Sequence, residues 1–556
     1  MIIKGRTIVS FFITVVFSTN VLSECLIITN VVGQTPVLDS RKLTKFDWLA
    51  IQSGKVLATG KKSDEKQYDH CRKLDGNERY MLPGLIDAHG HVSSLGNEML
   101  RVKLRDIKSE LLAVEEVKKF AELNKTSQWI LGRGWNQVLW LNKSFPSKRS
   151  LDQTGIKRPI VLRRIDGHAA WVNTKALEIA GITRDTADPQ GGKIERDTLG
   201  NPTGVLIDNA IDLVESKIPP PTFLEQDYAF DKAFAHLLSL GIVSVHDAGV
   251  TQLDLDIYKQ RSNQKTLPIR IYGMLNGSGK NLYQWLESGF IKDNDGFLSI
   301  RSVKLYSDGA LGSRGAALLT PYSDDIDNKG LLLTKPKKLE QLVENILSKG
   351  FQVNAHAIGD RGNRIVLNSI EKAYEKIGGK NLRNRIEHSQ IVSLTDIPRF
   401  KELDMIASMQ PVHATSDKNM AGARLGNERL KGAYAWQKFI QQGTVIASGS
   451  DFPVELANVF HGLHAAVTRQ SRDNLPKGGW LPDERMTPSQ ALRSFTIDAA
   501  YAAHQEQTLG SLEPGKWADF ILVDRDVING DPKEIWKTNV LQTWIAGELR
   551  FAKEKR

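Results

Sequence analysis

Short apolar runs alternate with longer stretches of helical periodicity through the middle of the chain. The runs have the length of strands and lie at residues 85–87, 242–245, 269–271, 303–306, 352–354, 385–386, 406–408 and 445–447. Stretches between them, such as 338–349 and 364–377, have the length and spacing of helices. This alternation is typical of parallel βα units, and eight strands close a TIM-like barrel. The pattern therefore predicts an α/β fold built on a (β/α)8 barrel.

The two ends of the chain have another pattern, in which apolar runs of strand length are separated by polar turns. We expect these ends to pair in one small composite β-sandwich, formed by residues 24–82 together with 508–556. The barrel would then occupy residues 83–507. Between its first strand and the strand at 242 lie about 150 residues, far more than a connecting helix needs. An inserted subdomain is therefore expected at about 96–240.

The first residues have the pattern of an export signal. Lys4 and Arg6 precede an uncharged apolar run at 7–21, which is too short for a comfortable membrane span of roughly 20 residues. We expect residues 1–23 to be a signal peptide, with an uncleaved membrane anchor as the alternative. The body of the protein would be secreted or exported in either case, and any membrane association would come through this segment alone.

The only two cysteines, Cys25 and Cys71, both lie in the expected β domain. A disulfide between them in an oxidising compartment and two unrelated thiols are both open interpretations.

Composition and charge narrow the class of protein. The 556 residues are 41% hydrophobic and 25% charged, as in an ordinary globular protein. The formal net charge is +10, but the basic residues are scattered instead of forming a stripe. This distribution favours a solvated surface, and we expect no nucleic-acid partner.

Residues of metal-ligand type stand at the ends of several predicted strands. His89 and His91 follow Pro83-Gly84-Leu85-Ile86-Asp87-Ala88, and alternate residues of an extended chain face the same side, so both imidazoles can point to one place. Other strands end close to Lys304, His356, His388 and Asp451. Because all strands of a parallel barrel open their carboxyl ends on one face, we expect these six side chains to converge.

Several motifs resemble those of the amidohydrolase superfamily, and in detail its Amidohydro_3 or YtcJ-like branch, which includes N-substituted formamide deformylases. They are the Pro-Gly-Leu-Ile-Asp-Ala-His-Gly-His entry to the first strand, Gly167-His168-Ala169-Ala170-Trp171-Val172-Asn173, Val245-His246-Asp247-Ala248-Gly249, Asp308-Gly309-Ala310-Leu311-Gly312-Ser313-Arg314, Asn354-Ala355-His356-Ala357-Ile358-Gly359-Asp360 and Gly449-Ser450-Asp451-Phe452-Pro453. The similarity runs from about Glu24 to near Phe551, and residues 510–519 resemble the segment that returns such chains to their small β-sandwich.

The resemblance implies a metal centre. His89 and His91 would bind one ion together with Asp451, His356 and His388 would bind a second, and Lys304 would bridge the two as a carbamate. A free ammonium has no lone pair to give a cation, so an unmodified Lys304 would leave a single ion. Imidazole and carboxylate donors suit Zn²⁺, although manganese, iron and cobalt also fit them.

The implied activity is hydrolysis of a carbon–nitrogen bond other than a peptide bond in a small amide, with N-formyl amines as one substrate class. A metal-bound hydroxide would attack the carbonyl, and Asp451 would carry its proton to the departing nitrogen. The alternatives are a non-catalytic binding protein on the same barrel and a cyclic-amide hydrolase or deaminase of the same superfamily. A homodimer is compatible with each.

Four more residues are candidates for substrate binding: Trp135 and His168 in the insertion, and Asp308 and Arg314 in the glycine-rich segment after Lys304. Each has a structural alternative, namely packing, a structural hydrogen bond or turn formation. For His246 we favour a supporting role. His413 lies just past the seventh strand and is not assigned to the site.

Overall fold

A parallel barrel forms the centre of the computed structural model, which describes residues 25–38, 40–125, 127–165 and 167–554. Its eight strands pair in chain order. They are β6 (Leu85–Gly90), β13 (Ile242–Val250), β14 (Arg270–Asn276), β16 (Leu298–Tyr306), β17 (Gln352–Ala357), β18 (Arg385–His388), β19 (Ile406–Met409) and β20 (Ile446–Ser448). A parallel bridge between Gly90 and Phe452 nearly closes the ring. The predicted (β/α)8 fold is confirmed.

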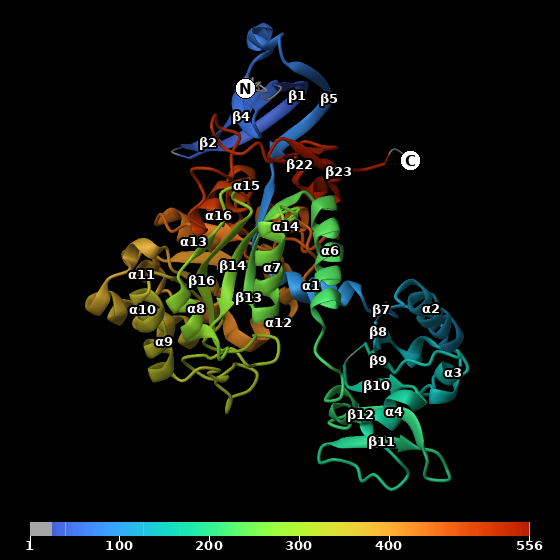
Figure 1. The fold of residues 1–556 in the computed structure, drawn as a ribbon. Helices are drawn as coiled ribbons and strands as arrows, with labels where there is room; N and C mark the ends of the chain where they lie inside the picture. Colours follow the sequence, from blue (N-terminus) through green and yellow to red (C-terminus); the bar gives the residue numbers. More distant parts are fainter. Residues whose placement is uncertain (1–24, 39, 126, 166, 555–556) are drawn as a thin grey trace, which may run out of the picture.

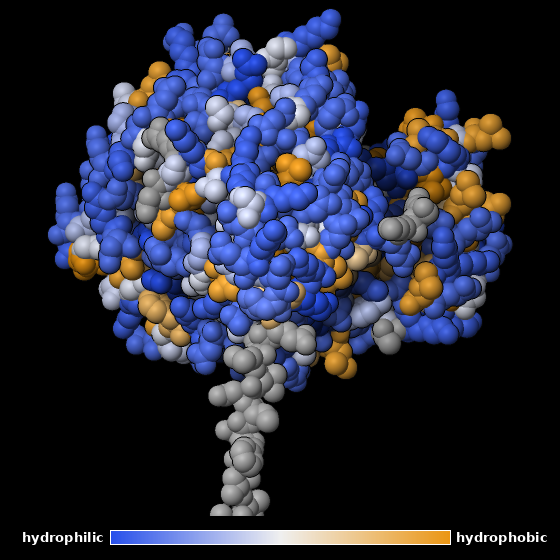
Figure 2. All heavy atoms as spheres, turned by 90° about the horizontal axis from the view of Figure 1, so that it is seen from above, coloured by the Kyte–Doolittle hydropathy of each residue, from blue (hydrophilic) through white to orange (hydrophobic). Residues whose placement is uncertain are grey.

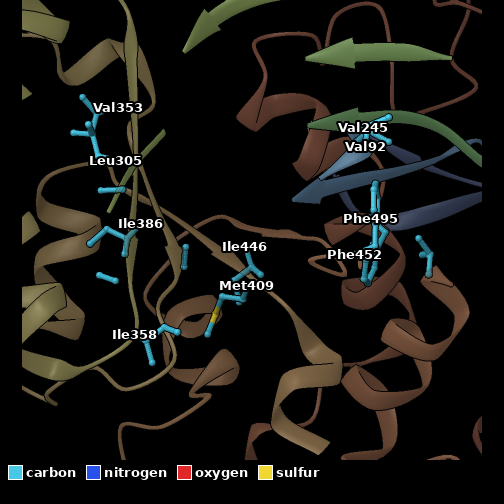
Figure 3. Packing of buried hydrophobic residues seen from close by; sticks show 14 of the residues in the cluster. Val92, Val245, Leu305, Val353, Ile358, Ile386, Met409, Ile446, Phe452 and Phe495 are labelled. Carbon is cyan, nitrogen blue, oxygen red and sulfur yellow. The ribbon is translucent and has the colours of Figure 1, made fainter. Parts of the chain in front are cut away.

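Helices follow the strands and cover the outside of the barrel (Figure 1). They include α7 (Gln252–Asn263), α8 (Leu282–Ser288), α9 (Pro336–Ser348), α10 (Asp360–Ile377), α11 (Ile397–Glu402), α12 (Pro411–Leu430), α13 (Trp436–Gln441), α14 (Val459–Thr468), α15 (Pro488–Ser494) and α16 (Ile497–Ala502). In α10 the buried Val366, Ile370 and Ala373 recur at helical spacing, so one face of the helix packs on the barrel. Figure 3 shows two parts of the hydrophobic core, one with Phe452 near Phe495 and another with Val353 near Leu305.

Strands from both chain ends form one continuous eight-stranded sheet, in the order β23-β22-β21-β5-β1-β3-β4 with β2 paired to β1. The bounds are β1 (Leu26–Val37), β2 (Ser40–Phe46), β3 (Trp48–Gln52), β4 (Lys55–Gly60), β5 (Arg72–Pro83), β21 (Phe520–Val523), β22 (Val540–Ile545) and β23 (Glu548–Ala552). The antiparallel pairing of β5 with β21 joins the ends, as the sequence predicts. A disulfide links Cys25 to Cys71, immediately before β1 and β5. The sheet lies at the top of Figure 1, next to the barrel.

The insertion after the first barrel strand is a separate lobe (Figures 1 and 2). The chain leaves the barrel through α1 (Val92–Met99) and returns through α6 (Phe223–Ser239). Between them a six-stranded sheet has the order β11-β12-β10-β9-β8-β7. Its elements are β7 (Val102–Lys103), α2 (Glu110–Leu123), β8 (Ile130–Trp135), α3 (Lys148–Asp152), β9 (Ile160–Arg164), β10 (Ala169–Val172), α4 (Thr174–Ala180), β11 (Gly192–Arg196), β12 (Pro202–Asp208) and α5 (Asp212–Glu215). Two apolar clusters give the lobe a core of its own.

The export signal expected at residues 1–23 lies outside the described residues. Within the described part of the chain, every helix is too short or too polar to span a bilayer.

Candidate metal centre

The ligand-type residues lie at the carboxyl ends of the barrel strands. His89 is in β6, and His91 directly precedes α1. Their ring nitrogens and a carboxylate oxygen of Asp451 lie within 4.8 Å of one another. A second group on the same carboxylate consists of His388, His413 and Asp451. Two neighbouring triads of metal-ligand type thus share Asp451.

Lys304 and His356 lie beside these triads. The Lys304 Nζ is 3.2 Å from the His89 Nε2, and the His356 ring centroid is 4.5 Å from that of His388. The six residues named from the sequence therefore lie at one rim of the barrel. The second triad contains His413 where His356 was expected.

Hydrogen bonds fix the orientation of three imidazoles. The Nδ1 atoms of His89, His91 and His388 contact the Glu387 carboxylate at 2.5 Å, the Ala248 carbonyl at 2.8 Å and the Gln410 side-chain oxygen at 2.8 Å. Because these oxygens can only accept, each Nδ1 carries the hydrogen and donates it. In the neutral rings the lone pair is therefore on Nε2, as a metal ligand requires.

The lone pairs of two imidazoles face a carboxylate that cannot donate to them. The Nε2 atoms of His91 and His89 lie 3.1 and 3.6 Å from Asp451 Oδ1. In the neutral rings this places acceptor against acceptor, an arrangement that a bridging cation satisfies. The Nε2 atom of His356 is also buried without a hydrogen-bond partner among the described residues. The donor set therefore fits a metal ion.

Burial sets the charge of these groups. It lowers the pKa of His89 to about 4 and that of His356 to about 3, with Lys304 acting in the same direction. Burial alone would raise the pKa of Asp451, but the nearby imidazoles of His91, His89 and His388 hold the pKa well below its usual range. Neutral His89 and His356 thus lie near an ionised carboxylate.

A buried ion pair supports His89 from behind. Arg385 Nε lies 3.1 Å from Glu387 Oε1, and both side chains are fully buried. Burial alone would raise the pKa of Glu387, but Arg385 and His89 hold it below its usual range. Arg385 also donates to the Nδ1 of His246 at 2.9 Å, which gives His246 a supporting position under the site.

Lys304 is buried, and burial lowers its pKa to about 8. As an ammonium it would bring a positive charge next to a metal ligand and offer no lone pair. Lys304 can therefore be a metal ligand at this position only if its amine is modified.

The structure corrects the expectation for Trp135. This side chain is fully buried in the core of the insertion, and its Nε1 donates to the Leu162 carbonyl at 2.7 Å. It packs between neighbouring aromatic rings in place of contacting a substrate. His168, on the same lobe, is exposed and pairs with Asp208 at 2.8 Å.

Asp308 and Arg314 order the loop after β16. The buried Asp308 carboxylate accepts the backbone N–H groups of Ala317, Ile358 and Gly359 at 2.8–3.0 Å. Arg314 forms two hydrogen bonds to Asp324. Of the two, Asp308 comes close to the metal-ligand residues, at 3.7 Å from the His356 Nε2.

Sequence reasoning missed His413 and the groups that orient the ligands. Gln410 and His413 are three residues apart at the start of α12, so they share a face of the chain. Gln410 holds His388, while Gln390 donates to the Nδ1 of His413 at 2.9 Å. The signal available was this spacing, together with Glu387 directly before His388.

Two of the ligand-type residues have unusual backbone conformations. His388 has φ = 78° and Asp451 has φ = 61°, in the left-handed region that residues other than glycine seldom adopt. Such strain persists where the surrounding structure fixes it, and it concentrates at functional sites.

Comparison with known proteins supports this assignment. The sequence profile of the amidohydrolase family matches residues 74–551. The LONG AFTER FAR-RED 3 protein of Arabidopsis thaliana is 33% identical over 522 residues, which cover 91% of this chain and 88% of the relative. The putative amidohydrolase YtcJ of Bacillus subtilis is 29% identical, with 90% and 95% coverage.

Two further proteins bear on chemistry. The N-substituted formamide deformylase of Arthrobacter pascens is 25% identical over 494 residues, which cover 86% of this chain and 89% of the relative. The second is an uncharacterized metal-dependent hydrolase from Pyrococcus furiosus, whose crystal structure is known and whose sequence is 28% identical. The two structures superpose with a TM-score of 0.75, and the match covers 90% of this chain and 99% of that chain.

Proposed function

The chain belongs to the amidohydrolase family, and from this premise we propose that it hydrolyses a carbon–nitrogen bond other than a peptide bond in a small-molecule amide. The observation that carries the proposal is the cluster of His89, His91, His388 and His413 around Asp451. The similarity to an N-substituted formamide deformylase makes N-formyl amines the first substrates to test.

The side chains have separate parts in the proposed reaction. When bound, a divalent cation, which we propose to be Zn²⁺, lowers the pKa of water toward neutrality and polarises the scissile carbonyl. Asp451 takes a proton from the attacking water and passes it to the departing amine nitrogen. The pKa of Asp451 is well below its usual range in this site, so the carboxylate is ionised before attack.

We propose two ions where Lys304 is a carbamate and one where it is not. A carbamate would replace the positive charge beside His89 with an oxygen donor. Growth with ¹³C-labelled carbon dioxide followed by carbon NMR of the metal-loaded protein tests this modification.

The test of the function starts with metal analysis of the purified protein. The chelated protein and the protein reloaded with zinc are then assayed on N-formyl amines, N-acyl amino acids and cyclic amides. Hydrolysis of a linear amide that disappears on chelation and returns with zinc is the expected result. Turnover of cyclic amides alone would support the alternative within the superfamily, and binding of no metal would favour a non-catalytic protein.

Replacing Asp451 with Asn should abolish turnover while the protein stays folded. The amide occupies nearly the same volume but cannot carry a proton, and loss of such a group costs about 10²–10⁴-fold in rate. The measurements are kcat on the best amide and the thermal unfolding midpoint. Full activity in Asp451→Asn would remove Asp451 as the proton carrier.

For its location, we propose that the protein is exported. The Cys25–Cys71 disulfide supports an oxidising compartment. Protein collected from the native host without reductant should resist thiol alkylation; two free thiols would contradict export.

A further inference from the structure

A pocket of about 170 Å³ is lined by residues that lie close in sequence to His413 and Asp451. For comparison, an apolar cavity of roughly 150 Å³ holds benzene, so a small organic group fits. The walls come from the start of α12, from the segment after Asp451, and from α14 with the residues that follow it.

Two chain segments connect the pocket to the site. Val412 and Thr415 line it and flank His413 on α12. Glu455 lines it from the opposite segment, four residues after Asp451. These short chain separations place the pocket near Asp451, and we take a side group of the substrate to extend into it.

The charged groups around the pocket are mainly cationic. Arg472 lines it and, among the described residues, has no side-chain hydrogen bond or ion pair. Lys418 does not line the pocket but contacts two lining residues: it donates to the Thr415 carbonyl at 2.9 Å and to the Ser471 hydroxyl. The single lining carboxylate, Glu455, already accepts a hydrogen bond from the Ser416 hydroxyl at 2.5 Å.

His461 adds a neutral donor. Its ring lines the pocket, and burial together with the neighbouring Arg472 lowers its pKa to about 4. A neutral imidazole keeps one N–H, which can donate to an anion without adding charge. The guanidinium and this N–H are thus two donors available on one side of the pocket.

We propose that this pocket binds a carboxylate of the substrate, with Arg472 as its ionic partner and His461 as a second donor. A guanidinium forms strong paired hydrogen bonds with a carboxylate. The inference rests on the proposed function and narrows it: the preferred substrates are N-acyl or N-formyl compounds that carry an anionic group on the far side of the amide.

The experiment uses the N-formyl derivatives of glycine, β-alanine and γ-aminobutyrate, each beside its primary amide. The three lengths place the carboxylate at increasing distances from the scissile bond. We expect at least one pair in which the carboxylate has a kcat/KM about tenfold or more above that of the amide, as one charge-assisted hydrogen bond provides. Arg472→Gln should remove the preference, and Arg472→Lys should retain part of it.

Arg72→Gln is the matched control, because Arg72 is also exposed but lies in β5 of the terminal sheet. It should keep the full preference. Equal kcat/KM for every carboxylate and its amide, or a preference that survives Arg472→Gln, would overturn the inference. A preference for ammonium-bearing analogues that disappears in Glu455→Gln would overturn it too, and would instead identify a cation pocket.

Failure of the proposed function is distinguishable from failure of the pocket. If the zinc-loaded protein hydrolyses no compound of the panel, nor any other amide, the function is wrong. Calorimetric binding of the same panel to wild-type and Arg472→Gln protein then decides the pocket alone: tighter binding of carboxylates that depends on Arg472 supports it, and equal binding overturns it.

Discussion

At the scale of single residues, the site depends on groups that never touch a substrate. Glu387 holds the His89 ring in place and is itself balanced by Arg385. A carboxylate behind a ligating imidazole makes the ring more basic and fixes its orientation. The metal affinity of the site should therefore depend on this buried pair as well as on the ligands.

Glu387→Gln should weaken metal binding about 10–100-fold, because a neutral amide polarises His89 less than a carboxylate does. It should also cost about 3–5 kcal/mol of folding free energy, because Arg385 stays buried without its partner. Metal titration and chemical denaturation measure the two effects. Glu506→Gln, which breaks the Arg383–Glu506 pair away from the site, is the control; it should leave metal affinity unchanged.

His504, which is not one of the ligand-type residues, makes the folding free energy depend on pH. Burial and the nearby Arg301 and Arg383 lower its pKa to about 4, from 6.5 in the unfolded chain. Below pH 6.5 His504 binds a proton in the unfolded chain but stays neutral in the folded protein. The folding stability linked to His504 is therefore lost as the pH falls from 6.5 toward 4.

His504→Asn should therefore be less stable than wild type at neutral pH, with a gap that narrows as the pH falls toward 4. Asparagine does not titrate and accepts the left-handed backbone of this position, where φ is 59°. Denaturant unfolding of both proteins at neutral pH and near pH 4 measures this difference in stability. A constant gap would show that His504 titrates alike in both states.

The sequence predicted ligand types better than it predicted their surroundings. His89, His91, His388 and Asp451 stand at strand ends, where alternation and barrel topology bring them together. His413 was not assigned because it lies in the first turn of α12, and its approach to Asp451 depends on how this helix begins. Trp135 lies in the core of the insertion, which is the packing alternative that the sequence left open.

At the scale of elements, the barrel closes where β20 meets β6. Gly449 lies at this seam, and a Cβ there would be 2.4 Å from the His89 backbone nitrogen and 2.7 Å from Asp87 Oδ1. The Asp87 carboxylate binds Ser450 across the same seam, through its backbone N–H at 3.0 Å and its hydroxyl at 2.6 Å. The segment after β20 thus packs against β6 next to a metal ligand.

Gly449→Ala should lower stability by about 1–3 kcal/mol through overpacking and weaken metal binding by displacing His89. Thermal unfolding and metal titration test this. Gly422→Ala is the control, since its nearest neighbour would be a Leu430 methyl at 3.9 Å. Unchanged metal affinity in Gly449→Ala would show that the backbone at residue 449 shifts without moving His89.

All eight barrel strands were found from sequence, because strands buried on both faces leave uninterrupted apolar runs. Their ends were less certain: β13 runs on to Val250 and β16 starts at Leu298, beyond the apolar runs at 242–245 and 303–306. The extra residues pair with neighbouring strands, which the chain order alone does not reveal.

At the scale of the whole molecule, a buried ion pair fastens the terminal sheet to the barrel. Arg270, the first residue of β14, forms two hydrogen bonds to Asp519 at 2.6 and 3.0 Å. Asp519 also accepts the Ala546 N–H at 2.8 Å. One carboxylate therefore joins the base of the barrel to strands from the end of the chain.

Asp519→Asn should cost about 3–5 kcal/mol, because Arg270 would stay buried without a counter-charge. Glu344→Gln, which breaks the exposed pair with Lys376, should cost at most about 1 kcal/mol. Denaturant unfolding of both variants measures the difference. Equal small losses would mean that water or a neighbouring acceptor replaces Asp519.

The domain boundaries stay predictions, and the pairing of the ends shows why sequence fixes them poorly. β5 runs to Pro83, past the expected limit at residue 82, and continues almost directly into β6. Because the terminal sheet passes almost directly into the barrel here, no polar linker marks the boundary between the two domains.

The pairing of β5 with β21 also sets an order of events during synthesis. At about 5–20 residues per second, tens of seconds pass between emergence of the first strand from the ribosome and emergence of its partner. Until then one edge of β5 has no neighbour on that side. The nascent protein must therefore keep an open sheet edge from aggregating until β21 has emerged.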